Sequence, residues 1–218
     1  MASPNEDVTH TSRRIFETSI EMFSRRGYAA TSVRDIAGAI GIESSSLYSH
    51  YSSKEEILWA ISADAITTLE SLQDDGVSAL VPTDRLREFV RRHVAYHAGN
   101  PLQARVVNNS MRSLTAQRWE AVIAFRKRYE ERLLRIIDSG LEAGDFNAPD
   151  ARIVTYAILQ MGMAVSEWFD STRRLDIEAI CDLYVEFACR IVGAPLSRDE
   201  RLAMPDAIGS TAVELGGE

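Results

Sequence analysis

Hydroxyl, aromatic and basic side chains crowd into one short stretch of this sequence, GIESSSLYSHYSSKEEIL, residues 41–58. Serines in the first turn of a helix lie beside unpaired backbone N–H groups and the positive end of the helix dipole, where phosphate binds. Tyr48, His50 and Lys54 would then point outward, and each could reach a phosphate oxygen or a base edge. The stretch is typical of contacts to nucleic acid, although a polar helix start followed by aromatic residues also occurs in ordinary folds.

Two short helices joined by a tight turn are needed to present this stretch. Ser32 and Asp35 have the spacing of a capping box, which predicts a short helix over VRDIAGAI. That helix stops at Gly41, and the next begins within two or three residues. A longer helix precedes them over residues 11–26, with Gly27 as its C-cap. This arrangement predicts a helix-turn-helix, whose second helix fits the major groove of DNA.

Charge is unevenly distributed along the chain. The net charge is −8, yet residues 13–54 contain six Lys or Arg against four acidic residues. A local basic patch on an acidic body can bind DNA, but it does so weakly per copy and with strong salt dependence. We therefore expect the protein to gain from being a dimer.

The segment ATSVRDIAGAIGIESSSLYSHYSSKEEIL resembles the N-terminal domain of TetR-type transcriptional repressors in the order and spacing of its residues. The resemblance extends from Arg13 to Leu58, and the length and helical remainder of the chain also fit this family. It implies one group of residues that contact bases, Arg34, Ser44, Ser45 and Tyr48, and a second group that contacts the DNA backbone, Ser32, His50 and Lys54. Glu43 departs from the family pattern, in which a serine cap is common, so the resemblance does not give the base preference.

One later helix carries two histidines on its apolar face. In DRLREFVRRHVAYHA, His93 and His97 lie four residues apart, beside Phe89 and Val94. Such a pair can bind a metal ion, but no third ligand is evident nearby, and we expect neither a metal nor a cofactor. The pair can also be two satisfied core histidines, or two hydrogen-bonding groups that line a pocket. Both alternatives stay open.

Other polar and adaptable side chains interrupt the apolar stripes of the neighbouring helices. Amides in an otherwise buried helix suggest a surface turn or contact with a bound polar group. Aromatic walls, thioethers and a few polar anchors are typical of ligand pockets, although most of these positions also fit an ordinary core. Besides the two histidines, the side chains we expect in such a pocket are Asn108, Met111, Trp119, Arg126, Tyr129, Gln160 and Met163.

The last two predicted helices, residues 152–169 and 177–192, are apolar on more than one face. A helix packed only against its own chain needs one stripe, so a second stripe implies a second partner. A self-complementary pair of such helices forms a four-helix dimer interface, and the family resemblance implies the same. The first of these helices has one stripe of Ile153, Ala157, Gln160 and Ala164. The interface residues that we expect lie on the other stripe and on the last helix: Val154, Ile158, Met161, Val165, Trp168, Ile180, Tyr184, Phe187 and Ile191.

The predicted fold class is all-α, with about nine helices. Apolar spacings of three and four recur nearly everywhere, and strict alternation over a strand's length is absent. We expect four parts: a flexible N-terminal arm over residues 1–12, a three-helix helix-turn-helix DNA-binding domain over 13–55, a larger helical ligand-binding and dimerisation domain over 56–194, and a loosely ordered tail over 195–218.

Several classes of protein do not fit the sequence. No apolar run approaches the roughly 20 residues that cross a bilayer, and the N-terminus has no signal-peptide core, so we expect a cytoplasmic protein without membrane contact. Cys181 and Cys189, about 12 Å apart if they share a helix, are beyond disulfide reach. No phosphate-binding Gly-rich loop or nucleophile elbow is present, so we expect no enzyme.

The sequence therefore predicts a repressor that binds a near-palindromic operator in double-stranded DNA as a homodimer. A small hydrophobic or amphipathic molecule would release it, by preferring a conformer in which the two DNA-binding ends are wrongly spaced. The Trp-Phe pair followed by LDIEAICDLYVEF is also similar to family members that sense acyl-CoA thioesters. The alternative is a helical interaction module that never binds DNA.

Overall fold

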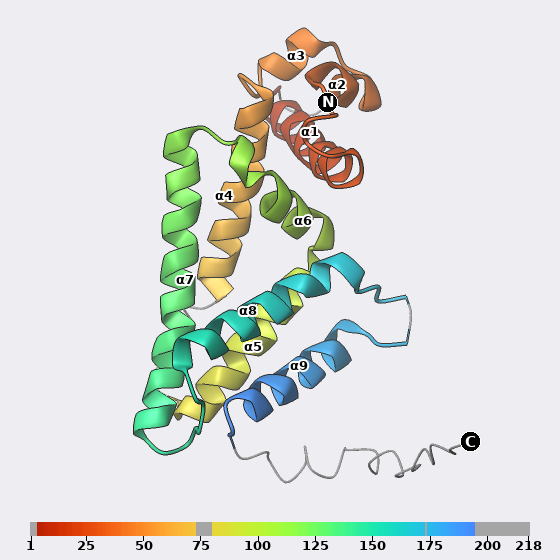
Figure 1. Cartoon of the computed structure of the whole chain (residues 1–218). Helices are drawn as coiled ribbons and strands as arrows, with labels where there is room; N and C mark the ends of the chain where they lie inside the picture. Colours follow the sequence, from red (N-terminus) through yellow and green to blue (C-terminus); the bar gives the residue numbers. More distant parts are fainter. Residues whose placement is uncertain (1–3, 73–79, 173, 195–218) are drawn as a thin grey trace, which may run out of the picture.

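The structure, a computed structural model, describes residues 4–72, 80–172 and 174–194. This part of the chain is all-α, with nine α-helices, one short 3₁₀ helix and no strand (Figure 1). The predicted fold class is confirmed. The predicted tail over residues 195–218 lies outside the described residues.

Three helices form the head at one end of the molecule: α1 (Pro4–Arg26), α2 (Val33–Ala39) and α3 (Ser44–Tyr48). Helix α1 begins at Pro4 rather than near Thr11, so residues 4–12 of the expected N-terminal arm are helical.

The predicted capping box at the start of α2 is confirmed. The Ser32 hydroxyl accepts a hydrogen bond from the backbone N–H of Asp35 (3.1 Å), and the Asp35 carboxylate accepts one from the backbone N–H of Ser32 (2.8 Å). At the other end, Gly41 has φ +71°, a conformation that glycine adopts without a steric penalty. The N–H of Ile42 then bonds to the carbonyl of Ala37 (3.0 Å), which closes the turn between α2 and α3.

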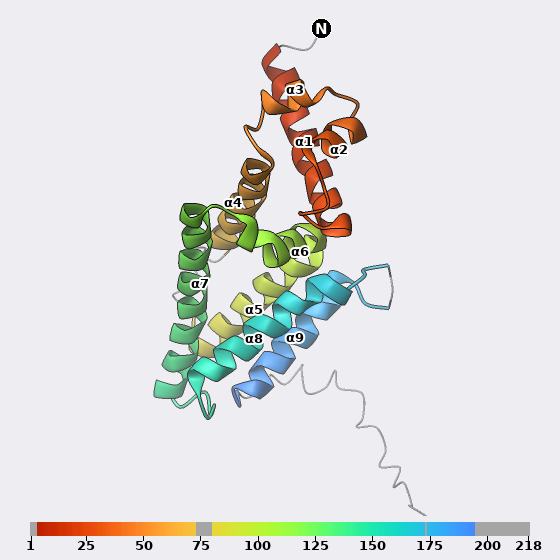
Figure 2. The same cartoon turned by 45° about the horizontal axis from the view of Figure 1, so that its top comes forward.

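Helix α5 (Pro82–Gly99) is the centre of the body. Helices α7 (Ala116–Glu142), α8 (Ala151–Trp168) and α9 (Ile177–Ile191) pack around it, and Figure 2 shows α8 and α9 side by side across it. The apolar stripe of α5 is fully buried there: Leu86, Phe89, Val90 and Val94. Cys181 and Cys189 are free and buried, as expected.

Two helices connect the head with the body. Helix α4 (Lys54–Leu72) runs out of the head alongside α7, and α6 (Pro101–Ser110), followed by the 3₁₀ helix η2 (Met111–Ser113), packs against α1, α4 and α8. The apolar core of the head includes Ile61 of α4 and Val106 of α6, so it extends past the predicted domain boundary at residue 55.

A polar contact reinforces this junction. Glu55, in the first turn of α4, accepts a hydrogen bond from the backbone N–H of Thr115 (2.9 Å) and forms an ion pair with Arg118. The guanidinium of Arg118 also lies over the ring of Trp59, 5.6 Å from its centroid. The beginning of α7 is therefore fastened to the beginning of α4, directly under the head.

Helices α8 and α9 each have an apolar stripe that faces away from the body. On α8 this stripe contains Ile153 (62% exposed), Ala157, Ala164 and Trp168 (54% exposed), and on α9 it contains Phe187 (42% exposed) and Ile191. We call these side chains the outer stripe. The second apolar face that the sequence indicated is therefore present.

Most of the predicted interface residues nevertheless lie on the face that packs against the body of their own chain. Five of its nine residues are buried in their own chain and leave little surface for a second copy: Val154, Ile158, Val165, Ile180 and Tyr184. Met161 is half-buried, and only Trp168, Phe187 and Ile191 are exposed. Periodicity separates the two stripes of a helix, but it does not tell which one the helix turns toward its own core.

No helix in the described part of the chain is long and apolar enough to span a membrane.

Candidate DNA-binding surface and ligand cavity

A shallow hollow on the head brings together five of the seven predicted DNA-contacting residues. The hollow is lined by Ser32, Val33, Arg34, Ser44, Tyr48 and Lys54, which come from the starts of α2 and α4 and from α3. Of the other two predicted residues, Ser45 is exposed in the first turn of α3, and His50 is half-buried just after that helix. Neither lines the hollow.

The packing of α3 decides which of its side chains can reach a ligand. Leu47 is completely buried in the head core, and this turns Tyr48 outward so that 52% of it is exposed. Glu43, at the N-cap, makes no side-chain hydrogen bond to the first turn of α3. The hydroxyls of that turn therefore lie at an exposed helix start.

Lys54 was expected to point outward, but its ammonium group is hydrogen-bonded within the head. Its ammonium donates hydrogen bonds to the carbonyls of Tyr28 (2.9 Å) and Thr31 (2.8 Å), and it lies 4.2 Å from the centroid of the Tyr28 ring. The carbonyls between α1 and α2 have no helical partner, and a half-buried cation satisfies them. Lys54 therefore fixes the loop between α1 and α2 to the start of α4 while it lines the hollow.

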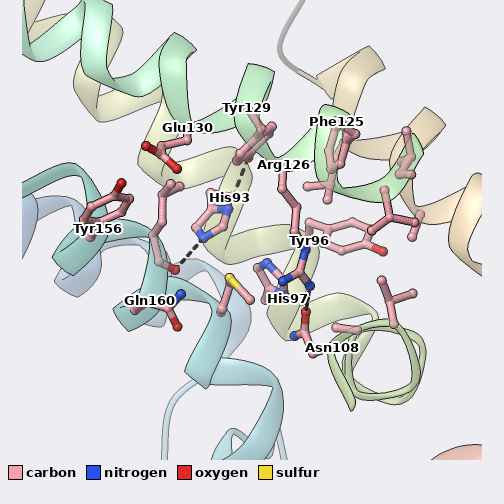
Figure 3. A pocket seen from close by; sticks show the side chains of 18 residues that line it. His93, Tyr96, His97, Asn108, Phe125, Arg126, Tyr129, Glu130, Tyr156 and Gln160 are labelled. Atoms are coloured by element: carbon pink, nitrogen blue, oxygen red, sulfur yellow. Dashed lines mark hydrogen bonds between the residues drawn. The ribbon is translucent and has the colours of Figure 1, made fainter. Parts of the chain in front are cut away.

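A second site lies inside the body, where a cavity of about 260 Å³ opens between α4, α5, α6, α7 and α8 (Figure 3). Most of its wall is aliphatic or aromatic. Seven of the nine predicted pocket residues line it: His93, His97, Asn108, Arg126, Tyr129, Gln160 and Met163.

Met111 and Trp119 do not line this cavity, so their predicted place is wrong. Both pack against the head core. Met111 follows the end of α6, where the chain turns toward the head, and Trp119 lies about 10 Å before Arg126 along the axis of α7. Two residues on one face of a long helix can therefore belong to different cores.

Several aromatic side chains of the lining were not predicted, among them Tyr96, Phe125 and Tyr156. Helical spacing could have found two of them. Tyr96 lies three residues after His93, and Tyr156 four residues before Gln160, so each shares a helix face with a residue that was predicted.

His93 is a satisfied buried histidine that borders the cavity. Its Nε2 lies 3.1 Å from the carbonyl oxygen of Leu159, which only accepts, so Nε2 carries the proton. Its Nδ1 then accepts from the hydroxyl of Tyr129, also at 3.1 Å. Burial lowers the pKa of His93 to about 4, which keeps the ring neutral at physiological pH.

His97 is less well satisfied. Its ring packs edge-on against His93 and Tyr96, with centroids 4.7 and 5.2 Å apart, and its Nδ1 is buried without a hydrogen-bond partner. Burial, followed by His93 and Arg126, holds the pKa of His97 well below its ordinary value. Among the described residues, no three His, Cys, Asp or Glu side chains come together as a metal site.

Arg126 brings a positive charge into this mostly apolar cavity. In Figure 3 its side chain extends toward His97 and Asn108, and its Nη2 donates a hydrogen bond to the Asn108 amide oxygen at 2.9 Å. Burial lowers the pKa of Arg126, but a guanidinium remains charged at neutral pH. The acidic residue of the lining, Glu130, is paired with Arg152 (3.4 Å).

Two tyrosines of the lining should respond oppositely to loss of their hydroxyl. The hydroxyl of Tyr96 is buried without a partner, so we expect Tyr96→Phe to leave the free energy of unfolding unchanged or to raise it by about 1 kcal/mol. Tyr129→Phe removes the bond to His93 and should lower it by about 1 kcal/mol. Urea unfolding of both variants measures the difference. A larger loss for Tyr96→Phe would contradict this assignment.

The buried histidines should make stability fall in mild acid. Because the pKa of His93 is depressed to about 4 in the folded chain and is about 6.5 when unfolded, only the unfolded chain takes up the proton between these values. We expect the free energy of unfolding to decrease as pH falls below about 6.5, by up to about 3 kcal/mol near pH 4, with His97 acting in the same direction.

Thermal or urea unfolding between pH 8 and pH 4.5 tests this pH dependence. The doubly substituted variant His93→Gln/His97→Gln should show a flatter decline than the unmodified chain, whereas His50→Gln, in the head, should keep the full decline. Equal slopes for all three proteins would show that the buried pair does not cause it.

Comparisons with known proteins agree with this two-part architecture. A model of bacterial regulatory proteins of the tetR family matches residues 15–61, and a model of the tetracyclin repressor-like C-terminal domain matches residues 79–192. The transcriptional repressor KstR2 of Mycobacterium tuberculosis is 30% identical over 138 residues, which are 62% of this chain and 68% of that protein.

Solved structures are similar over most of the chain. A regulatory protein in the tetR family from Rhodococcus RHA1 has a TM-score of 0.79 and 33% identity, covering 85% of this chain and 98% of that one. AibR, solved with isovaleryl coenzyme A and operator DNA, has a TM-score of 0.74 and 24% identity, covering 84% and 99%. Because the second family model alone spans more than half of the sequence, this chain belongs to the TetR family of DNA-binding transcriptional regulators.

Proposed function

We propose that this chain is a repressor that binds a near-palindromic DNA operator as a homodimer and releases it when a small molecule enters the body cavity. The observation that carries the proposal is the hollow on the head, which gathers Ser32, Arg34, Ser44 and Tyr48 at one exposed surface. A relative is named as a transcriptional repressor, which supports the same direction of regulation.

Direct reading of bases is assigned to Arg34, Ser44, Ser45 and Tyr48, because they are exposed or half-exposed around the start of α3. Ser32 and His50 are assigned to the DNA backbone. Lys54 is also assigned to the DNA backbone. Its ammonium group is already hydrogen-bonded to two carbonyls of the protein, so it contributes a positive charge to the hollow but no free hydrogen-bond donor that could follow a phosphate. A protein-interaction module that does not bind DNA would not need these hydrogen-bond donors grouped at one surface.

Dimerisation is proposed through the outer stripe of α8 and α9. Isolated exposed apolar residues are common, but a continuous stripe over two neighbouring helices is typical of an interface. Two copies packed through these helices would form a four-helix arrangement and present two α3 helices to half-sites about 34 Å apart or a multiple of that distance.

Ligand entry can be communicated to the head through α6. Val107 and Asn108 line the cavity, while the adjacent Val106 is buried in the head core. On its other side, Arg105 donates a hydrogen bond from Nε to the carbonyl of Ser166 on α8 (2.8 Å). A ligand that draws Arg126 away from Asn108 would change the position of a helix that also packs against α1.

The effector is proposed to be a small hydrophobic or amphipathic molecule. The aromatic and aliphatic lining of the cavity supports this, and so does the isovaleryl coenzyme A bound to AibR. An acyl-CoA thioester is therefore one candidate class. At about 260 Å³ the cavity lies slightly below the roughly 300–1,000 Å³ that is typical of ligand sites, so a coenzyme A group would extend out of it.

Loss of a proposed base-reading side chain should weaken operator binding. We expect Tyr48→Ala to cost about 1–3 kcal/mol of binding free energy per half-site while the dimer stays intact. The measurement is a salt-titrated mobility shift, on a duplex selected from a random-sequence pool by the unmodified protein.

Arginine substitutions supply the matched control for the same duplex. Arg34→Ala should weaken binding and reduce its salt dependence, whereas Arg135→Ala, at an exposed arginine near the C-terminal end of α7, should do neither. If the unmodified chain selects no duplex even at low salt, the repressor proposal fails. If Tyr48→Ala and Arg34→Ala both bind normally, only the contact assignment fails.

A charge in the outer stripe should separate the two copies. We expect Phe187→Asp to convert a dimer to a monomer in sedimentation velocity and to weaken operator binding more than tenfold, because a carboxylate would be buried without a partner. Ile123→Asp, at an equally exposed apolar position of α7, should remain a dimer. A Phe187→Asp dimer with unchanged affinity would place the interface elsewhere.

A further inference from the structure

The cavity has an uncompensated positive charge. Among the described residues, Arg126 forms no ion pair, and its hydrogen-bond partner, Asn108, is a neutral amide. The two histidines beside it are neutral, and Glu130 is engaged by Arg152. A half-buried cation loses part of its hydration and regains little from an amide, so an anionic group placed beside it would be favoured.

An unused hydrogen-bonding atom lies close to this charge. The Nδ1 of His97 is buried without a partner, and the ring of His97 lies beside the Arg126 guanidinium in Figure 3. Neutral histidine can donate one hydrogen bond, and arginine only donates. The shared complement of these two side chains is an oxygen that accepts.

We propose that Arg126 and His97 form the binding point for the carboxylate or carbonyl oxygen of an acyl ligand, whose chain lies against the apolar wall of the cavity. That wall includes Phe125, Leu159 and Met163. This inference rests on the proposed function, and it adds the chemical class and the orientation of the effector. If the ligand brings a carboxylate, it would also draw Arg126 away from Asn108, because a charged acceptor is a stronger partner than an amide oxygen.

The size of the cavity suggests the probe. At about 260 Å³ the cavity lies slightly below the usual range for ligand sites, so a short acyl chain such as the octanoyl group is a suitable probe. Free acids and acyl-CoA thioesters both bring such a chain with an acceptor oxygen at one end. Octanoate and octanoyl-CoA represent the two sources.

Isothermal titration calorimetry of the full chain at pH 7.5 can test the proposal with four probes: octanoate, octan-1-ol, octanoyl-CoA and coenzyme A alone. We expect octanoate or octanoyl-CoA to bind at least about tenfold more tightly than octan-1-ol and coenzyme A, because a hydrogen bond to a charged group typically contributes this much. Tighter binding of octanoate identifies the free acid as the effector class, and tighter binding of octanoyl-CoA identifies the thioester.

Two arginine variants on the same helix give the matched comparison. Arg126→Met keeps the length and packing of the side chain but removes its charge, and it should weaken binding of the preferred probe by about 10- to 100-fold. Arg128→Met removes an exposed arginine that is paired with Glu70 outside the cavity, and it should bind the probe normally. Circular dichroism of each variant checks that it is folded, and Arg126→Gln replaces Arg126→Met if the latter is not.

Binding of both octanoate and octanoyl-CoA no tighter than that of octan-1-ol and coenzyme A by the unmodified chain would overturn the proposal without the use of any variant. Unchanged affinity of a folded Arg126→Met protein, or no binding of all four probes, would overturn it as well. Operator binding by the ligand-free, unmodified protein is measured in parallel. If this protein does not bind the operator, the proposed function is refuted. If it binds the operator but the calorimetric result is negative, only the proposed ligand class is refuted.

Discussion

Helices α4 and α6 are each packed on two sides, against the core of the head and against the core of the body. This packing joins the two parts of the protein. Ile66 of α4 and Val107 of α6 pack against both apolar cores. Between these helices, the Gln103 amide donates to the carbonyl of Ile61 (3.2 Å) and to the carboxylate of Asp64 (2.8 Å). Because tightly packed cores rearrange in discrete steps rather than deform continuously, this shared packing supports the proposal that a change beside α6 in the cavity reaches the head.

The cavity combines polar groups that a purely structural core would avoid. His93 is paired through both ring nitrogens, but the Tyr96 hydroxyl and the Nδ1 of His97 are buried without partners, and Arg126 has a neutral one. Each unsatisfied group lowers the stability of the folded chain. Such groups are typical of sites in which binding, rather than packing, determines the choice of residue.

The head must expose hydrogen-bond donors while keeping two short helices, α2 and α3, in place. Lys54 and the capping box at Ser32 satisfy backbone groups that short helices leave unpaired. The side chains of Lys54 and Ser32 therefore stabilise the fold at the edge of the surface on which Arg34 and Tyr48 are exposed. A net acidic body and a small basic surface limit the affinity of one copy for DNA. The outer stripe is an exposed apolar surface through which two copies could pair.

Local signals in the sequence determined the all-α class, the capped start of α2, the glycine turn at Gly41 and the inward direction of Leu47, because each depends on neighbours within a few residues. Periodicity also placed seven cavity residues, but it could not separate Trp119, which packs under the head, from Arg126 in the cavity. It identified two stripes on α8, but the stripe that was expected at the dimer interface is mostly buried in the body. Only tertiary packing decided these points, since the partner of a helix face is supplied by segments far away in the chain.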